Sequence, residues 1–198
     1  VPYQILKAEH LNNIESGIVN LESVINNMNN MNINNDVVNY DLNVKAVNHR
    51  GYSKGAPENT IPAYIMSKQK GFTYVECDVS FTKDSVAVLL HDSTIDRTSN
   101  GSGNVQSLTY EQLLQYDFGS WYSSKFAGTK IPTLEEALKD SKLYGYKLQI
   151  EPKESWTTND RAETVVGLIE KYNMEKGTIG IISTEGIYYY IGGCYIDA

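Results

Sequence analysis

The sequence beyond residue 44 alternates between short runs rich in β-branched residues and longer segments with helical periodicity, and this alternation restricts the possible folds most strongly. We expect strands at Val44–His49, Tyr74–Ser80, Val86–His91, Lys147–Glu151 and Thr178–Ser183. We expect helices at Thr60–Lys70, Leu134–Leu143 and Arg161–Tyr172. Strands that alternate with helices usually form a parallel sheet, so the sequence predicts an α/β fold made of a β/α repeat.

Residues that commonly begin and end helices flank these predicted helices. Asn59 and Thr133 stand at two helix starts, where a side-chain oxygen can accept a hydrogen bond from a free backbone N–H. Gly71, Gly145 and Gly177 follow the helices and are typical of helix C-terminal ends.

Residues 1–44 form a separate N-terminal segment, because the pattern there changes. Apolar residues recur in alternating steps of three and four, which is a heptad pattern, at Leu11, Ile14, Ile18, Leu21, Ile25 and Met28. This pattern predicts a short coiled coil with other copies of the chain, or an amphipathic helix that packs on its own domain. The tract "NNMNNMNINND", Asn26–Asp36, favours a helix end and a linker. We therefore divide the chain into residues 1–44 and residues 45–198.

Composition excludes some classes of function. The net charge is −7 and the isoelectric point is about 5.0, which disfavours a general nucleic-acid binder. No apolar run reaches the roughly 18–20 residues that span a bilayer, and the N-terminus lacks the basic and apolar regions of a signal peptide, so we expect a soluble protein. Its two cysteines, Cys77 and Cys194, do not have the spacing of a metal site.

Charged and ionisable side chains gather at the predicted strand ends. His49 and Arg50 end the first strand and His91 ends the third, while Glu151 and Lys153 end the fourth. In parallel α/β folds this edge of the sheet carries the functional residues. These residues therefore form the candidate site.

Two carboxylates share one face of the second predicted strand. Glu76 and Asp78 are two residues apart, so their side chains leave the same face about 7 Å apart and repel unless a hard cation lies between them. Glu151 from another strand could complete the set of oxygen ligands. Cys77 must point to the opposite face, where we expect it to pack in the core.

Other polar and aromatic residues receive plainer interpretations. We expect Glu58 and Asn59 to be loop and cap residues, and Asp92, Asp96 and Arg97 to form a structural ion-pair or turn network. We expect His10 to be solvated. The aromatic stretch "YDFGSWYSSKF", Tyr116–Phe126, either lines a substrate pocket or anchors its own loop.

Several motifs in this region resemble those of the glycerophosphodiester phosphodiesterase family. They occur in the family's order between about Val44 and Ser183, as "HRG", "PENT", "VECDVSFTKDSVAVLLHD", "DRTSNGSG", "IPTLEEAL" and "IEPK". The resemblance implies a TIM-barrel phosphodiesterase in which His49 and His91 are the general acid and base. It further implies one Mg²⁺ or Ca²⁺ ion held by Glu76, Asp78 and Glu151. Arg50 and Lys153 would bind the substrate phosphate.

These residue types suit phosphodiester hydrolysis. The anionic oxygens of a phosphodiester repel nucleophiles, so the site needs fixed positive charge. Imidazole, with a reference pKa near 6.5, can move protons at the attacking and leaving oxygens near neutral pH.

The length of the chain departs from the family pattern. A complete eight-stranded barrel takes about 250 residues, so we expect a barrel that stops after about five strands.

The stretch "AEHLNNIESGI" resembles the helical openings of phage tail and baseplate proteins, which implies a homo-oligomer, with a trimer favoured, in a virion-associated or extracellular setting. The substrate would then be a glycerophosphodiester or a glycerol-phosphate polymer such as teichoic acid. The alternative is a non-catalytic tail or receptor-binding module that keeps the fold.

Overall fold

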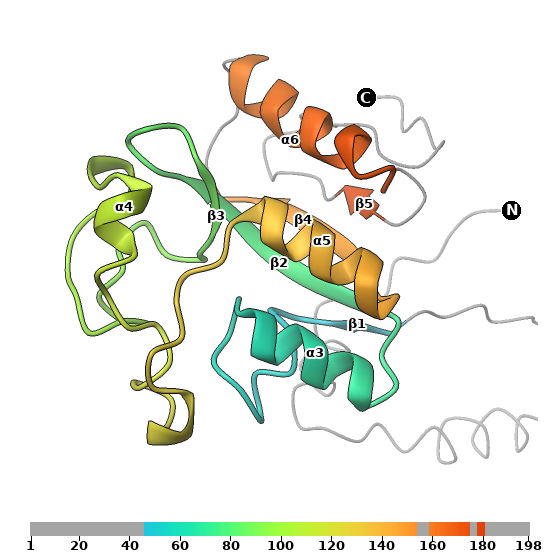
Figure 1. The fold of residues 1–198 in the computed structure, drawn as a ribbon, viewed down its shortest axis with the longest axis horizontal. Helices are drawn as coiled ribbons and strands as arrows, with labels where there is room; N and C mark the ends of the chain where they lie inside the picture. The colour runs from blue at the N-terminus through green and yellow to red at the C-terminus, as the bar shows by residue number, and fades with distance from the viewer. Residues whose placement is uncertain (1–45, 154–158, 175–177, 181–198) are drawn as a thin grey trace, which may run out of the picture. The chain divides into compact units, whose positions relative to one another are not determined.

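The computed structural model describes residues 46–153, 159–174 and 178–180. Within these residues, strands and helices follow one another along the chain (Figure 1), with 3₁₀ turns between some of them. In order they are β1 (Val47–Asn48), α3 (Ile61–Gln69), β2 (Tyr74–Phe81), β3 (Ala87–Leu89), η1 (Val105–Ser107), α4 (Tyr110–Leu113), η2 (Ser124–Phe126), α5 (Leu134–Tyr144), β4 (Lys147–Pro152), α6 (Asn159–Lys171) and β5 (Thr178–Gly180).

The strands of the described residues form one sheet that is largely parallel, as the β/α pattern predicts. β1, β2, β4 and β5 lie side by side in that order, and every pair of neighbours is parallel. α3 connects β1 to β2 and α6 connects β4 to β5, which are the crossover connections that parallel strands require.

The third strand differs from the prediction. We expected residues 86–91 to be another parallel strand, but β3 pairs with β2 in the antiparallel direction, with Val79 opposite Leu89. Only the five residues 82–86 separate β2 from β3, too few for a parallel crossover but enough for a hairpin. The prediction of five parallel strands is therefore wrong, and the described part of the repeat has four.

Strand β2 is buried along its whole length and separates two environments. Its odd-numbered residues enter the first core, which lies between the sheet and helices α3, α5 and α6 on one face (Figure 1). This core is centred on Ala63, Tyr64, Val75, Cys77, Val79, Phe81, Leu134, Ala137, Leu138, Leu148, Ile150, Ala162, Val165 and Ile169. The packing role expected for Cys77 is confirmed, because this residue is fully buried among apolar side chains.

The segment between β3 and α5 has its own apolar cluster. This second core consists of Val88, Leu90, Ile95, Val105, Leu113, Phe118 and Ile131. It includes residues on and beside β3, so it anchors the segment to the end of the sheet. The second core therefore supports the chain that follows His91.

The helix ends match the sequence in part. Thr133 caps α5 in a capping box with Glu136, and Gly145 ends the same helix in the left-handed conformation with φ of 71°. The cap predicted at Asn59 is wrong, because α3 begins after Thr60, and the side chain of Asn59 hydrogen-bonds to Asp78 instead. Gly71 follows α3 with φ of 90°, as expected of a helix-ending glycine.

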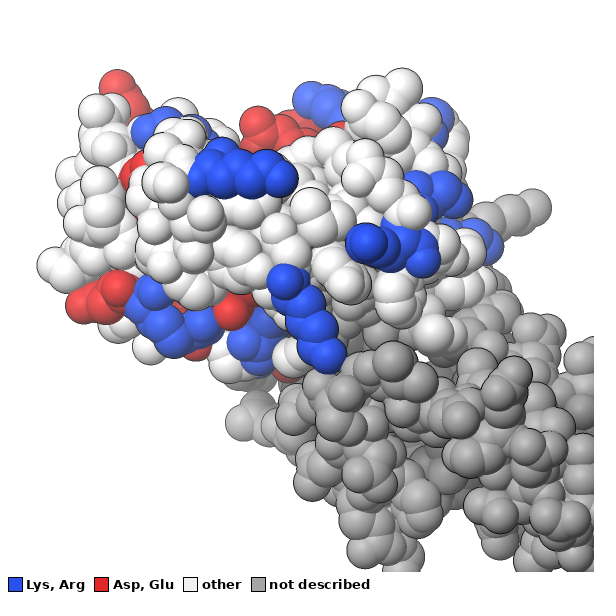
Figure 2. Space-filling model, turned by 90° about the horizontal axis from the view of Figure 1, so that it is seen from below, with Lys and Arg blue, Asp and Glu red and all other residues white. Residues whose placement is uncertain are grey.

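Several predictions concern residues outside those that the structure describes. They are the heptad pattern and linker of residues 1–44, Gly177, Cys194, the start of the first strand and the last three residues of the fifth. Within the described ranges, no helix combines the length and apolar character needed to cross a membrane. On the face seen in Figure 2, Lys and Arg side chains lie in separate groups between uncharged and acidic surface.

Candidate active site

The candidate site lies along one edge of β2, where two strands leave a gap. β1 pairs with the start of β2 at Tyr74 and Val75, and β3 pairs with its end from Val79 onward. Val79 also pairs with Pro152 of β4, so β1 and β3 must share the other edge of β2. Residues that follow β1 and β3 therefore approach the middle of β2 from two directions.

Three carboxylates meet at the middle of β2. One oxygen from each of Glu76, Asp78 and Glu151 lies within 4.8 Å of the other two. The register explains this, since Asp78 pairs with Glu151 across β2 and β4. Glu76 and Asp78 are buried, with 4% and 0% of their surface exposed. Burial, followed by the charge of Asp78, raises the pKa of Glu76 to about 8.

The backbone after β1 takes a tight turn that brings Arg50 to these carboxylates. Arg50 has φ of 55°, and its backbone N–H donates to Glu76 Oε2 at 2.7 Å. A Cβ atom at Gly51 would lie 2.8 Å from side-chain atoms of Ala63 and Tyr64, so only glycine allows α3 to pack this closely. The Arg50 guanidinium pairs with Asp78 Oδ2, with Nε at 3.2 Å.

Lys153 approaches the same carboxylates from the end of β4. Its Nζ donates to Glu151 Oε1 at 2.8 Å and lies 3.5 Å from Asp78 Oδ1. Burial opposes the positive charge of Lys153, but the hydrogen bond to Glu151 and the charges of Asp78 and Glu151 outweigh this effect and raise its pKa.

The two histidines differ in their surroundings. His49 is 64% exposed at its side chain, and its Nε2 lies 3.9 Å from Glu76 Oε2. Partial desolvation and the charge of Arg50 lower the pKa of His49, so its ring is neutral near pH 7. The Nδ1 atom of His91 hydrogen-bonds to Asp92 Oδ1 at 2.6 Å. Arg97 holds the pKa of Asp92 at about 2, so this carboxylate acts as the acceptor.

The site has more carboxylates than cationic side chains, which favours the binding of a divalent cation. Five carboxylates face three cationic side chains, the carboxylates being Glu58, Glu76, Asp78, Asp92 and Glu151 and the cations Arg50, Arg97 and Lys153. Within the described part of the chain, Glu76 Oε1 and Asp78 Oδ1 are buried without a hydrogen-bond partner. Hard cations take carboxylate oxygens of this kind, so the residues fit the Mg²⁺ or Ca²⁺ ion that the sequence predicts.

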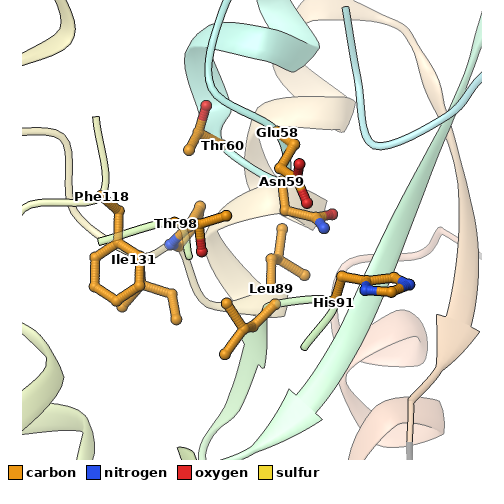
Figure 3. A pocket seen from close by; sticks show the side chains of 10 residues that line it. Glu58, Asn59, Thr60, Leu89, His91, Thr98, Phe118 and Ile131 are labelled. Atoms are coloured by element: carbon orange, nitrogen blue, oxygen red, sulfur yellow. The ribbon is translucent and has the colours of Figure 1, made fainter. Parts of the chain in front are cut away.

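A small cavity lies beside the site but cannot hold a substrate. Figure 3 shows Glu58 and Asn59 on one side of it and His91 on the other, with Phe118 and Ile131 at its end. Its volume is about 10 Å³, which is close to the lower limit for a single water molecule. This cavity is therefore not a candidate for the substrate-binding site.

Comparisons with known proteins identify the family of the chain. The model of the glycerophosphoryl diester phosphodiesterase family matches residues 49–183 of the chain. The chain belongs to this family. The match includes every residue of the candidate site, from His49 to Lys153.

Relatives of known name and structure extend the comparison. A glycerophosphodiester phosphodiesterase of Caldanaerobacter subterraneus is 39% identical over 132 residues, which cover 66% of this chain and 54% of that protein. The crystal structure of a glycerophosphodiester phosphodiesterase from Agrobacterium tumefaciens superposes with a TM-score of 0.66 at 32% identity, over 72% of this chain and 59% of that one. A phosphodiesterase of Oleispira antarctica, solved in complex with the product sn-glycerol-3-phosphate, gives a TM-score of 0.61 at 30% identity, over 65% and 53%. This chain spans about half of the length of each relative.

The structure of this family member brings together the residues that the sequence selected. His49, Arg50 and the three carboxylates surround the gap along β2, Lys153 reaches them from β4, and His91 follows β3. Their chemical roles stay predictions.

Sequence reasoning missed one polar contact of the site. Asn59 donates to Asp78 Oδ2 at 2.7 Å, accepts from the Asp78 backbone N–H at 3.1 Å and accepts from the Tyr64 hydroxyl at 3.1 Å. Its position before a predicted helix is typical of an ordinary N-cap residue. The seven residues between "HRG" and Asn59 form a loop that returns to Arg50, whose carbonyl accepts from the Asn59 N–H, but this closure is visible only in three dimensions.

The aromatic stretch anchors its own loop. Trp121 packs edge-on against Tyr122, and Tyr122 packs in the same way against Phe126. The indole of Trp121 donates to the Phe118 carbonyl at 3.0 Å. These contacts favour the anchoring interpretation over a pocket lining.

Proposed function

We propose that the protein hydrolyses glycerophosphodiesters in a metal-dependent reaction that uses His49 and His91 for proton transfer. The observation that supports this most strongly is the convergence of three carboxylates, His49 and two cations on the middle of β2, with His91 close enough to interact electrostatically with His49. The family relationship supports the same reaction class.

Glu76, Asp78 and Glu151 would hold the divalent ion, because two of their buried oxygens lack a protein hydrogen bond within the described residues. When bound, such an ion supplies positive charge that offsets the negative charge of the reacting phosphate. The backbone N–H of Arg50 fixes the Glu76 carboxylate from the opposite side. The ligand set is therefore held in place before any ion arrives.

Arg50 and Lys153 would bind the phosphodiester. Both are only 19% exposed at their side chains, and both already lie against the carboxylates of the site. A guanidinium can donate two parallel hydrogen bonds to phosphate oxygens, and an ammonium adds a point charge. Together they lower the electrostatic cost of bringing a nucleophile to an anionic phosphorus centre.

The histidines would move the protons. The neutral ring of one histidine can take a proton from the attacking oxygen, and the protonated ring of the other can give a proton to the leaving oxygen. In neutral His91 the proton sits on Nδ1, because the ionised Asp92 accepts there, so Nε2 is the nitrogen available for proton transfer. The two rings follow β1 and β3, which approach β2 along the same edge.

The phosphodiester group defines the proposed substrate class. A small diester such as glycerophosphocholine and a polymer such as poly(glycerol phosphate) present the same phosphodiester and differ in what extends away from it. We propose both as substrates, and their relative rates would define the preference.

The test is an assay of the purified chain against glycerophosphocholine and poly(glycerol phosphate), with EDTA and with added Mg²⁺ or Ca²⁺. We expect chelation to abolish turnover, and we expect His49→Ala or His91→Ala to lower kcat by about 10² to 10⁴. His10→Ala is the matched control, since it removes the third histidine of the chain and should leave kcat unchanged. Full activity after exhaustive chelation, or a normal kcat for His91→Ala, would refute the proposed mechanism.

A further inference from the structure

We propose that Arg97 is a positioning residue that fixes His91 and Arg50 relative to each other across the site. This inference rests on the proposed function for its catalytic consequence, but it also makes a claim about the His91 ring that can be measured without turnover. The observation behind it is a continuous chain of hydrogen bonds through the Arg97 guanidinium.

Arg97 holds two carboxylates at once. Its Nε donates to Asp92 Oδ2 at 2.7 Å and its Nη2 to Asp92 Oδ1 at 3.1 Å. Its Nη1 and Nη2 donate to Glu58 Oε2 and Oε1, both at 2.8 Å. The guanidinium therefore joins Asp92 to Glu58 as a rigid planar fork, a geometry that a lysine ammonium cannot copy.

Each of these carboxylates holds a residue of the proposed reaction. Asp92 Oδ1 accepts from Nδ1 of His91 at 2.6 Å. Glu58 Oε1 accepts from Nη1 of Arg50 at 3.2 Å. The proposed proton-transfer residue and the proposed phosphate-binding residue thus meet through Arg97.

The two ends of this series of hydrogen bonds lie on different parts of the fold. On one side, Ile95 is fully buried in the second core, and its N–H donates to the Gly103 carbonyl at 3.0 Å, so the backbone next to Arg97 is fixed. On the other side, the Asn59 N–H donates to the Arg50 carbonyl at 3.0 Å, which closes the loop that carries Glu58. Arg97 is the side chain that links these two supports.

Stability alone does not account for this arrangement. Arg97 is 45% exposed at its side chain, and exposed ion pairs contribute little to folding. The network instead determines geometry, because it restrains the Asp92 carboxylate that orients the His91 ring. Misplacement of a reacting group by about 1 Å can cost on the order of 10²-fold in rate.

The kinetic test compares Arg97→Met, Arg97→Lys, Glu58→Gln and the double variant Glu58→Gln with Arg97→Met. We expect Arg97→Met to lower kcat/KM about 10- to 100-fold with most of the loss in kcat, and Arg97→Lys to recover only a minor part of it. The double variant should lose little more than Arg97→Met alone, because both changes break the same connection. Lys171→Met is the matched control. It removes the ion pair at 2.8 Å between Lys171 of α6 and Glu135 of α5, and it should leave kcat/KM unchanged.

The second measurement is the ¹⁵N spectrum of the histidine rings, which is simple because the chain has three histidines. In the unmodified protein, neutral His91 should carry its proton on Nδ1; in Arg97→Met the two neutral forms should mix, and in Lys171→Met they should not. A changed His91 spectrum in an inactive protein would support the positioning role and refute the proposed function. An active protein in which Arg97→Met leaves either the His91 spectrum or kcat/KM unchanged would overturn the positioning role.

Discussion

Two residues in the left-handed conformation delimit the loop that builds the site. Arg50 has φ of 55° and Asn59 has φ of 53°, a conformation that costs most residues about 1–2 kcal/mol. The cost is offset locally, since the Arg50 carbonyl accepts from the Asn59 N–H at 3.0 Å. Both residues also contact Asp78. Backbone strain is thus present beside the proposed metal ligands.

Residue types and strand ends were enough to predict which side chains gather at the site. His49, Glu76 and Glu151 are chemically suited to a phosphodiesterase wherever they occur, and the β/α pattern places them on one edge. The role of Asn59 could not be predicted in this way. A capping asparagine and one that supports a carboxylate look identical in sequence, and only the position of Asp78 distinguishes them.

Replacement of Asn59 by glycine tests its support of Asp78. Glycine adopts the left-handed conformation without strain, so the change removes only the side chain. The buried Asp78 Oδ2 would keep only Arg50, while the Asp78 N–H and the Tyr64 hydroxyl would lose their Asn59 acceptor, and we expect a loss of about 2–4 kcal/mol in the free energy of unfolding. Urea unfolding measures this loss, and calorimetry with Ca²⁺ measures the accompanying loss of ion affinity.

Asn59→Ala serves as the comparison for the backbone. It removes the same hydrogen bonds but keeps a Cβ atom at φ of 53°, so it should be about 1 kcal/mol less stable than the glycine variant. A glycine variant as stable as the unmodified protein would show that the asparagine side chain supports nothing.

At the scale of elements, the hairpin of β2 and β3 shows that a sequence pattern can predict a strand without predicting its direction. The apolar run from Val86 to Leu90 has the composition of a buried strand in either direction. Its direction follows from the short turn, in which Ser85 has φ of 61° and the Val86 N–H donates to the Thr82 hydroxyl at 2.9 Å. Direction matters for the site, because an antiparallel β3 returns His91 toward the middle of β2.

The loop between α4 and α5 is organised by one carboxylate. Asp117 accepts from the backbone N–H groups of Gly119 and Gly128, both at 2.7 Å, and of Ser120 at 3.0 Å. The Ser120 hydroxyl donates to it at 2.6 Å. The hydrogen bond from this hydroxyl, followed by those from the backbone, holds the pKa of Asp117 well below its ordinary value. The loop therefore depends on the ionised form of Asp117.

This dependence predicts how stability changes with pH. Because folding lowers the pKa of Asp117, its contribution is fully present above the unfolded pKa near 3.9 and is lost as pH falls below that value. Asp117→Asn should therefore be less stable by about 1–3 kcal/mol at pH 7, and the difference should shrink below about pH 4. Urea unfolding between pH 3 and pH 7 measures both values. Glu163→Gln, which neutralises an exposed carboxylate on α6, should show a smaller difference at pH 7, and an equal one at that pH would contradict the assignment.

At the scale of the whole molecule, the site and the fold depend on the same strand. β2 pairs with β1 and β3 along one edge and with β4 along the other, and its odd-numbered residues belong to the first core. The same strand carries Glu76 and Asp78 on its opposite face, where burial and the charge of Asp78 raise the pKa of Glu76 to about 8. The apolar face of β2 thus stabilises the sheet, while its acidic face opposes that stability unless positive charge is supplied.

This opposition predicts that a divalent ion stabilises the whole protein. An ion that binds the folded state at 100 times its Kd adds about 2.7 kcal/mol to the free energy of unfolding. For a chain of 198 residues, we therefore expect Tm to rise by about 5–10 °C when Ca²⁺ or Mg²⁺ replaces EDTA. Differential scanning calorimetry measures the shift, with KCl at matched ionic strength as the control for screening. Asp78→Asn should remove the shift, because it neutralises the most buried of the three carboxylates, whereas Glu163→Gln should preserve it. An equal rise in Asp78→Asn would place the stabilising ion elsewhere on the molecule.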